Sequence, residues 1–180
     1  MARAFIGLGS NIEPAQHIRQ AVRLLGQVAP VVAISTIYRT PAQGPAGRPA
    51  FYNGVVEMQA DLPPRALKTE LARIEAALGR RRTADPDAPR PIDLDLLLYG
   101  DLVADEPGLR LPHPDLERRA FVAEPLREVA PGLRLPGSGR SIEEVARALL
   151  PAPMRPLAEY TASLRRELPD EPRQGGAPRR

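Results

Sequence analysis

The order of strand-like and helix-like segments is the feature that most limits how this chain can fold. Strand-like stretches occur at residues 3–8, 28–39, 51–59 and 92–99. Helical periodicity fills two of the gaps between them, at about 14–25 and from after Asp61 to Gly79. The resulting order β-α-β-β-α-β is that of the split βαβ, or ferredoxin-like, sheet. We therefore predict an α/β sandwich with a ferredoxin-like core.

Apolar spacing supports the two helices. The first has apolar residues at i, i+3, i+4 and i+7 and ends at Gly26, and the second has a similar stripe and ends at Gly79. The apolar stripes are Ile18, Ala21, Val22 and Leu25 in the first, and Leu67, Leu71, Ile74 and Leu78 in the second. Residues 28–39 are rich in β-branched side chains, which predicts one long strand pairing antiparallel with 51–59.

The second half of the chain adds smaller elements. Short strands are predicted at 102–104 and 109–111, and a helix at about 115–129. Ser141 with Glu144 forms a capping box that starts a last helix, which ends near Leu150. We expect one domain over residues 1–155 and a C-terminal extension over 156–180, with a short helix at 155–166 and disorder from about 167, where the chain is polar and rich in Pro, Gly and Arg.

Composition narrows the class of protein. A length of 180 residues suits one domain, and no apolar run approaches the roughly 20 residues of a membrane helix. No signal peptide is apparent and there is no Cys, so we expect a cytoplasmic monomer without disulfides or membrane contact. The net charge of +3 could suggest nucleic acid. Because the arginines are spread along the chain and Lys68 is the only lysine, we expect no nucleic-acid partner.

Two acids stand at the start of an apolar strand, in the sequence Pro-Arg-Pro-Ile-Asp-Leu-Asp-Leu-Leu-Leu at residues 89–98. Side chains two apart on a strand share a face, so Asp93 and Asp95 should lie together, followed by Leu97. The opposite face should carry Leu94, Leu96 and Leu98. An acid pair in a partly buried strand needs compensation, and Mg²⁺ is commonly held by one or two carboxylates plus substrate phosphates. The alternative is an edge strand with two solvated acids.

Arginines flank this acid pair, at Arg80, Arg81 and Arg82 and at Arg90. Arginine beside a carboxylate metal site is the combination that phosphoryl transfer uses. Solvated charges that happen to cluster are the alternative. The whole arrangement resembles the signature of the 6-hydroxymethyl-7,8-dihydropterin pyrophosphokinase family of folate biosynthesis. Colinear matches over roughly residues 3–150 carry the resemblance: residues 5–11 (Phe-Ile-Gly-Leu-Gly-Ser-Asn), 38–41 (Tyr-Arg-Thr-Pro), 51–53 (Phe-Tyr-Asn), 89–95 and 111–113 (Leu-Pro-His).

The resemblance implies transfer of pyrophosphate from ATP to the pterin hydroxymethyl group, with AMP as the second product. It implies that Asp93 and Asp95 hold two Mg²⁺ ions and that Arg80 and Arg90 act on the transferring group. The pterin-binding residues that it implies are Thr40, Pro41, Gln43, Phe51, Asn53 and Phe121. The ATP-binding residues are Glu75, Arg82, Leu96, His113 and Arg119. The family often carries a Trp shortly before the signature Arg, whereas this chain has none, so a closing loop over 80–91 cannot use an indole.

Several of these residues also have ordinary interpretations. Phe51 and Asn53 share a strand face and suit a flat heterocycle, but they could be core with a hydrogen-bonded amide. His113, between two prolines, could be a half-exposed loop histidine, and Glu75 a solvated charge or an ion-pair partner of Arg73 or Arg80.

The segment Gly7-x-Gly9-Ser10-Asn11 lacks the third Gly of a dinucleotide loop and the Lys of a Walker loop. We therefore interpret it as a tight turn in which Ser10 or Asn11 caps the next helix.

Two other functions remain compatible with the residues themselves. A generic Mg²⁺-dependent nucleotide hydrolase would consume ATP without a pterin. A ferredoxin-like RNA-binding module would need paired aromatic residues on the sheet face, and the aromatic content here is only 4%.

Overall fold

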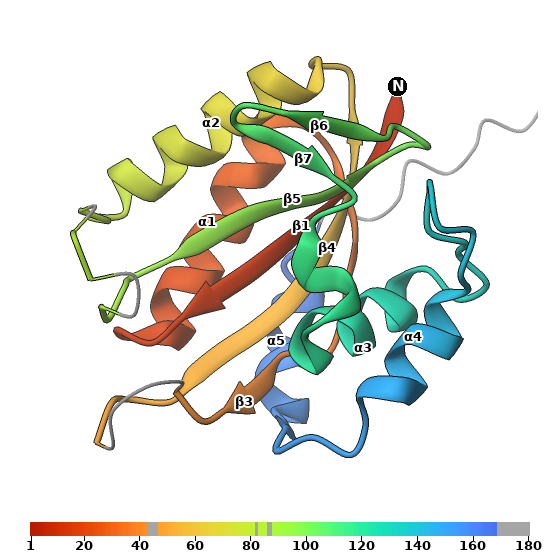
Figure 1. The fold of residues 1–180 in the computed structure, drawn as a ribbon. Helices are drawn as coiled ribbons and strands as arrows, with labels where there is room; N and C mark the ends of the chain where they lie inside the picture. The colour runs from red at the N-terminus through yellow and green to blue at the C-terminus, as the bar shows by residue number, and fades with distance from the viewer. Residues whose placement is uncertain (43–46, 82, 86–87, 169–180) are drawn as a thin grey trace, which may run out of the picture.

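The computed structural model describes residues 1–42, 47–81, 83–85 and 88–168. A twisted sheet runs through its centre in the order β5 (Asp93–Tyr99), β1 (Ala2–Ser10), β4 (Phe51–Ala60), β3 (Tyr38–Thr40) and β8 (Arg155–Pro156), and β2 (Val31–Ile34) also pairs with β4 (Figure 1). All of these neighbours are antiparallel. With β2 and β3 taken as one broken strand, the order is that of the ferredoxin-like sheet, and the predicted fold class is confirmed.

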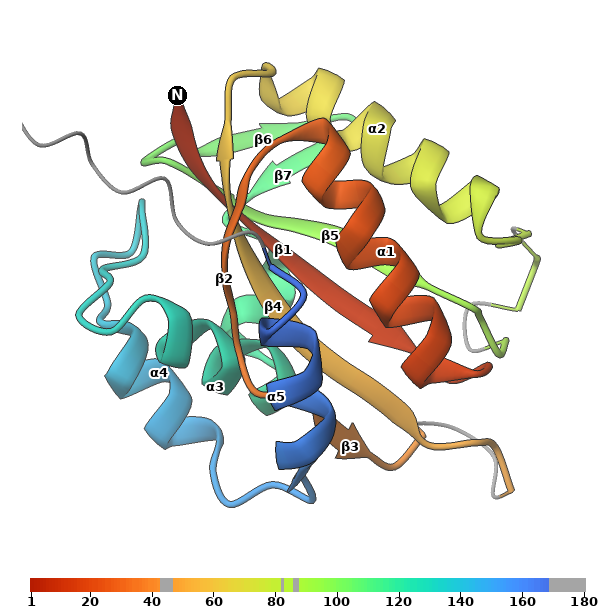
Figure 2. The same ribbon diagram turned by 180° about the vertical axis from the view of Figure 1, so that it is seen from behind.

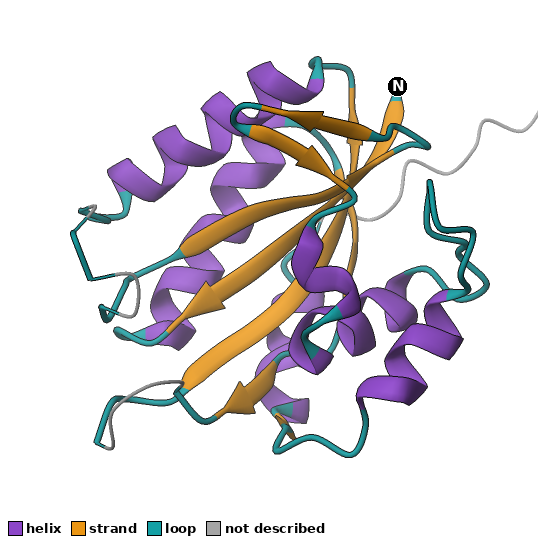
Figure 3. Ribbon diagram, in the orientation of Figure 1, coloured by secondary structure: helices purple, strands orange, loops and turns teal. Residues whose placement is uncertain are grey.

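Helices cover both faces of the sheet (Figure 2). On one face, α1 (Pro14–Val28) and α2 (Pro64–Ala77) bury their predicted apolar stripes together with Leu164 of α5 (Ala158–Arg165). On the other face, α3 (Ala120–Val129) and α4 (Ile142–Leu149) pack on Phe5, Val55 and Leu97. A hairpin of β6 (Ala104–Glu106) and β7 (Leu109–Leu111) precedes a 3₁₀ helix at Pro114–Glu117 (Figure 3). No helix in the described part of the chain is long and apolar enough to cross a membrane.

The predicted long strand over 28–39 is broken between β2 and β3. At the break, Ser35 still exchanges hydrogen bonds with Val55: its N–H donates to the Val55 carbonyl and its hydroxyl accepts from the Val55 N–H, each at 2.9 Å. Two residues later the N–H of Ile37 donates to the hydroxyl of Thr161 on α5 instead of to a strand neighbour, at 2.9 Å. Gly54 lies directly beneath, where an added Cβ would come within 2.5 Å of the Ile37 side chain. Side-chain partners from elsewhere in the chain therefore interrupt the ladder.

The acid-bearing strand differs from the predicted alternation at one position. Asp93 and Asp95 share a face and Leu97 continues it, as expected, while Leu94 and Leu96 pack on the opposite side. Leu98, however, belongs to the same core cluster as Leu97. The pairing of β1 with β5 is shifted between Phe5 and Ile6, so that Phe5 lies opposite Leu98 and Ile6 opposite Leu96. This irregularity leaves one extra residue on β5 and turns Leu98 to the other face.

The predicted helix over 115–129 is also divided. The 3₁₀ helix ends at Glu117, and Arg119, whose backbone is extended, separates it from α3. The capping box at Ser141 is confirmed, with hydrogen bonds in both directions between Ser141 and Glu144.

The C-terminal segment contacts the body up to its last described residues. Glu167 forms ion pairs with Arg19 and Arg23 of α1, at 3.3 and 2.8 Å, and Leu168 packs against the core. The disorder expected from about residue 167 otherwise falls on residues 169–180, which lie outside the described residues.

Two truncations should distinguish the contribution of residues 167–168 from that of residues 169–180. We expect removal of residues 169–180 to leave both catalytic turnover and the melting temperature nearly unchanged, because their polar composition offers little to bury. Removal from Glu167 onwards should lower the melting temperature by a few degrees, since it also deletes the Glu167 ion pairs and the Leu168 contact. Thermal melts of both truncated proteins test this expectation. A large drop in melting temperature on removal of residues 169–180 alone would contradict it.

Candidate active site

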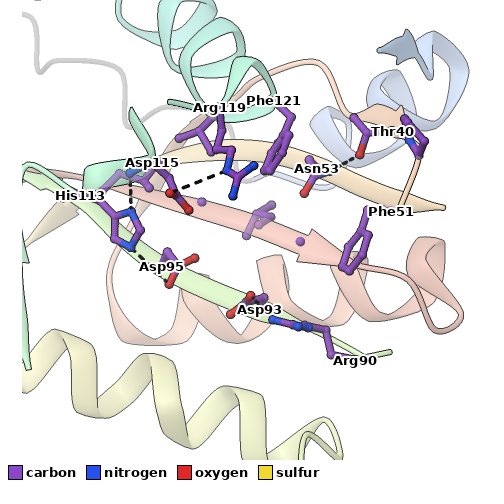
Figure 4. Close-up of a pocket in the computed structure, with 17 residues that line it drawn as sticks. Thr40, Phe51, Asn53, Arg90, Asp93, Asp95, His113, Asp115, Arg119 and Phe121 are labelled. Carbon is purple, nitrogen blue, oxygen red and sulfur yellow. Dashed lines mark hydrogen bonds and ion pairs between the residues drawn. The ribbon is translucent and has the colours of Figure 1, made fainter. Parts of the chain in front are cut away.

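A pocket of about 280 Å³ opens on the sheet face that carries the two acids (Figure 4). Its floor comes from β1, β4 and β5, and its far wall comes from the 3₁₀ helix and the start of α3. The lining residues that bear on its chemistry are Thr40, Pro41, Phe51, Asn53, Arg90, Asp93, Asp95, His113, Asp115, Arg119 and Phe121. Segments from both halves of the sequence therefore meet in one cavity.

Asp93 is held between two arginines. One carboxylate oxygen accepts from Arg80 at 2.5 Å and the other from Arg90 at 2.9 Å. Arg80 also donates to Glu75 of α2, and the same Glu75 oxygen accepts from the backbone N–H of Leu94 at 2.8 Å. Burial acts to lower the pKa of Arg80, but Asp93 and Glu75 more than offset it, so that this pKa lies above its ordinary value. Arg80 is thus a fixed cation that joins α2 to β5.

Glu75 is almost fully buried, at 6% exposed. Burial raises its pKa above the ordinary value, against the opposing effects of the Leu94 N–H and of Arg80. Of the two ordinary interpretations from the sequence, the structure supports the ion pair with Arg80, since Arg73 pairs with Glu70 instead.

Asp95 has a different environment from Asp93. Its nearest ion-pair partner is His113, with Nε2 at 4.0 Å from the carboxylate. Burial in the pocket raises the pKa of Asp95 above its ordinary value, and the charge of Asp93 adds to this effect. The Nδ1 atom of His113 accepts a hydrogen bond from the N–H of Asp115 at 3.2 Å. In the neutral ring the proton is therefore assigned to Nε2, the atom that faces Asp95.

An aromatic and amide wall lies beside the acids. Phe51 extends from β4 and Phe121 from the first turn of α3, and both line the cavity. The Asn53 side chain donates to the Thr40 hydroxyl at 2.7 Å, which fixes the amide between the two rings in the close-up (Figure 4). The guanidinium of Arg90 lies 6.0 Å from the centroid of Phe51 and so connects this wall to the acid pair.

Ser10 and Asn11 do not cap α1, contrary to the prediction. The N-cap of α1 is Glu13, and no side chain caps the helix there. Ser10 instead donates to the Pro91 carbonyl at 2.5 Å, and the Asn11 side chain accepts from the Arg90 N–H at 2.7 Å. The end of β1 therefore holds the backbone of residues 90–91, directly before the acid-bearing strand. A local capping rule could not anticipate partners about 80 residues away.

The structure gathers most of the residues expected in the site. Arg80 and Glu75 are not among the residues that line the pocket; Arg80 donates to Asp93 at its edge and to Glu75 behind it. The side chain of Leu96 points to the opposite face, into the core beneath α1 and α2. Gln43 and Arg82 lie outside the described residues. Sequence reasoning missed Asp115, which lines the pocket and is 3.9 Å from Arg119; its position two residues after His113 was the available signal.

The acid pair suits a hard cation whose remaining ligands come from a phosphate chain. The described residues contain no group of three or more His, Cys, Asp or Glu that could hold a metal by themselves. Asp95, whose charged form is disfavoured by burial and by Asp93, would gain from a nearby cation. Asp93 already has an arginine on each oxygen, so a cation there must share the carboxylate with them or displace one. These features fit Mg²⁺ bound together with a phosphorylated substrate.

A ferredoxin-like sheet that brings carboxylates, arginines and two phenylalanines into one pocket fits a small phosphotransferase. Comparison with known proteins gives the family. The family model of 7,8-dihydro-6-hydroxymethylpterin-pyrophosphokinase (HPPK) matches residues 5–131. The chain belongs to this family and is a pyrophosphokinase.

Individual relatives agree with the family match. The chain is 40% identical over 149 residues to the 2-amino-4-hydroxy-6-hydroxymethyldihydropteridine pyrophosphokinase of Pseudomonas aeruginosa, covering 81% of this chain and 91% of the relative. It is 42% identical over 156 residues to that of Methylorubrum extorquens, covering 84% and 96%.

Among solved structures, wild-type HPPK-DHPS of Plasmodium falciparum matches with a TM-score of 0.62 and 12% identity, covering 82% of this chain. The match spans 43% of the length of that longer chain. At this identity the match supports the fold alone.

Proposed function

We propose that this protein transfers the β,γ-pyrophosphoryl group of ATP to the hydroxymethyl oxygen of 6-hydroxymethyl-7,8-dihydropterin, releasing AMP, as a monomer in the cytoplasm. The observation that carries the proposal is that one cavity places an arginine-flanked acid pair beside two phenylalanines and a fixed amide. The first set suits a triphosphate with its metal, and the second suits a flat, hydrogen-bonding heterocycle. A bisubstrate reaction needs both sets within reach of each other.

The pterin slot is assigned to the aromatic and amide wall. Phe51 and Phe121 would stack on the two faces of the ring, and Asn53 would pair with its edge, its orientation set by the bond to Thr40. Thr40 and Pro41 border the slot, and Gln43 is proposed to belong to the same edge. This placement directs the hydroxymethyl group toward Asp93 and Asp95, where the reacting oxygens would meet.

The triphosphate is assigned to the opposite side of the acids. His113 offers its Nε2–H, and Arg119 a guanidinium, from the segment just before α3. Glu75 would act by holding Arg80, and Arg82 by adding positive charge. Since the Leu96 side chain faces the core, Leu96 could contact ATP only through its backbone on the edge strand β5.

Two Mg²⁺ ions, when bound with ATP by Asp93 and Asp95, would neutralise the phosphate chain and orient the attacking hydroxyl. Arg80 and Arg90 would stabilise negative charge on the transferring group, since both already lie at the acid pair. The loop from 80 to 91 would close over the substrates and exclude water, which prevents hydrolysis of ATP. No side chain needs to form a covalent bond.

The test is AMP formation from ATP and Mg²⁺, measured with and without the hydroxymethyl pterin. We expect AMP and the pterin diphosphate in equal amounts only when both substrates and the metal are present. Chelation of the divalent metal with EDTA should reduce turnover to background, and added Mg²⁺ should restore it. ATP consumption that does not depend on the pterin would favour a nucleotide hydrolase, and RNA binding without ATP turnover would favour a binding module.

A further inference from the structure

The two walls of the proposed pterin slot belong to different layers of the fold. Thr40 and Asn53 stand on the sheet, whereas Phe121 extends from the start of α3. The spacing between the sheet and this helix therefore sets the width of the slot. A group that ties α3 to the slot-bearing strands would control that width without touching the substrate.

Glu128, near the end of α3, makes such a tie. Its carboxylate accepts one hydrogen bond from the N–H of Thr36 at 2.7 Å and a second from the hydroxyl of Tyr38. Thr36 lies in the break between β2 and β3, and Tyr38 is the first residue of β3. Glu128 follows Phe121 by seven residues, or about two helical turns, and it is not among the residues that line the pocket.

Tyr38, which bonds to Glu128, lies next to the slot residues on the sheet. Tyr38 is directly paired with Asn53 across β3 and β4, and Thr40 is two residues further along the same face. Asn53 and Thr40 are themselves hydrogen-bonded. Burial raises the pKa of Tyr38 above its ordinary value, and the bond to Glu128 raises it further, so that the hydroxyl remains a donor at neutral pH. A shift of Tyr38 would move both slot residues relative to Phe121.

We infer that Glu128 is a positioning residue for the heterocycle slot: through Thr36 and Tyr38 it holds the Thr40–Asn53 edge in place relative to Phe121, so that a ring stacked on Phe121 can also pair with Asn53. The inference rests on the proposed function, because it takes the slot to be the pterin site. It assigns no direct role in phosphate binding, since His113, Arg119 and the acid pair are held by other contacts.

Glu128→Ala should therefore act on one substrate only. We expect the dissociation constant for the hydroxymethyl pterin to rise roughly tenfold or more, while the KM for ATP changes less than about twofold. Glu128→Gln should bind nearly as the parent does, because its amide oxygen can accept from Thr36 while its NH₂ donates to the Tyr38 oxygen. A uniform loss of affinity for both substrates would indicate only a damaged fold and would overturn the inference.

Two further variants complete the experiment. Tyr38→Phe removes one of the two bonds with little change in shape, and it should weaken pterin binding in the same direction but less. It also keeps the inference testable if Glu128→Ala fails to fold. Glu70→Ala is the matched control, because Glu70 lies on α2, away from the slot, and pairs with Arg73 on the same helix, at 2.7 Å.

Equilibrium pterin titration of each folded variant gives the answer. If the parent binds no pterin, the proposed function itself fails. If the parent binds pterin and the Glu128→Ala and Tyr38→Phe proteins bind it equally well, or if Glu70→Ala is as weak as Glu128→Ala, the positioning role is wrong.

Discussion

Replacement of Asp95 by alanine is expected to lower kcat by about 10³-fold or more while the protein stays folded. Asp95 is the acid whose carboxylate has the fewest protein partners, with His113 at 4.0 Å, and it is therefore the more available of the two to a metal. Loss of a metal ligand removes several kcal/mol of stabilisation from the transferring phosphates. A coupled enzymatic assay of AMP release at saturating Mg²⁺ and ATP measures this change in kcat. Turnover within tenfold of the parent would show that Asp95 does not hold an essential cation.

The same residue allows a separate test on the metal-free protein. Folding raises the pKa of Asp95, through burial first and the charge of Asp93 second. A carboxyl whose pKa is raised in the folded state contributes stability below its unfolded pKa, and this contribution is lost as the pH rises through the folded pKa. At neutral pH the ionised Asp95 should therefore destabilise the metal-free fold.

Asp95→Asn removes this charge, and we expect its melting temperature in EDTA to equal or exceed that of the parent at pH 7–8. The difference should shrink as the pH falls through the raised pKa of the parent Asp95 carboxyl, where the parent also loses the charge. Asp101→Asn, at an exposed turn, serves as the control. A clearly lower melting temperature for the metal-free Asp95→Asn protein would assign Asp95 a structural role instead.

Arg90→Ala should lower kcat by roughly 10²-fold or more, the scale for loss of an electrostatic stabiliser of the transition state. Arg90 contacts Asp93 at 2.9 Å, and its backbone is held by Asn11, so its guanidinium is already close to where charge would build. Because the guanidinium also lies 6.0 Å from the centre of Phe51, we expect pterin affinity to fall by no more than a few fold. Steady-state kinetics combined with pterin titration separates the two effects.

Two comparisons sharpen this experiment. Arg90→Lys should recover little of the lost kcat, since an ammonium cannot reproduce the planar fork that reaches Asp93 and the phosphate together. Arg73→Ala, on the exposed side of α2, removes an equal charge away from the pocket and should leave kcat unchanged. Strongly weakened pterin binding with an intact kcat would instead make Arg90 a substrate-binding residue.

Local patterns were sufficient for most of the fold. Helices with regular apolar stripes, such as the one over 14–25, and the acid-bearing strand β5 depend on burial patterns that are visible within a few residues. The interrupted strand at Ser35–Ile37 could not be foreseen, because its backbone finds partners on Val55 and Thr161. The placement of Leu98 on the same face as Leu97 likewise depends on how β1 pairs with β5.

In the candidate site, too, some features could be predicted from the sequence and others could not. The acids and arginines were visible because they lie close together in the sequence, in a combination that phosphoryl transfer uses, and their roles remain proposals. The hydrogen bonds that hold them were not visible. Glu75 accepts a hydrogen bond from the N–H of Leu94, 19 residues away, and Asn11 accepts one from the N–H of Arg90, 79 residues away. Contacts of this kind depend on tertiary geometry, which no periodicity encodes.

The attachment of the C-terminal segment has a consequence for the order in which the enzyme is completed during synthesis. β8 pairs with the outer edge of β3, and Thr161 receives the Ile37 N–H from 124 residues earlier. A ribosome releases β8 and Thr161 after β1, β4 and β5 have all emerged. The acid-bearing half of the cavity can thus assemble on the nascent chain, whereas the strand that carries Thr40 stays open on one side until residues 155–161 have been made.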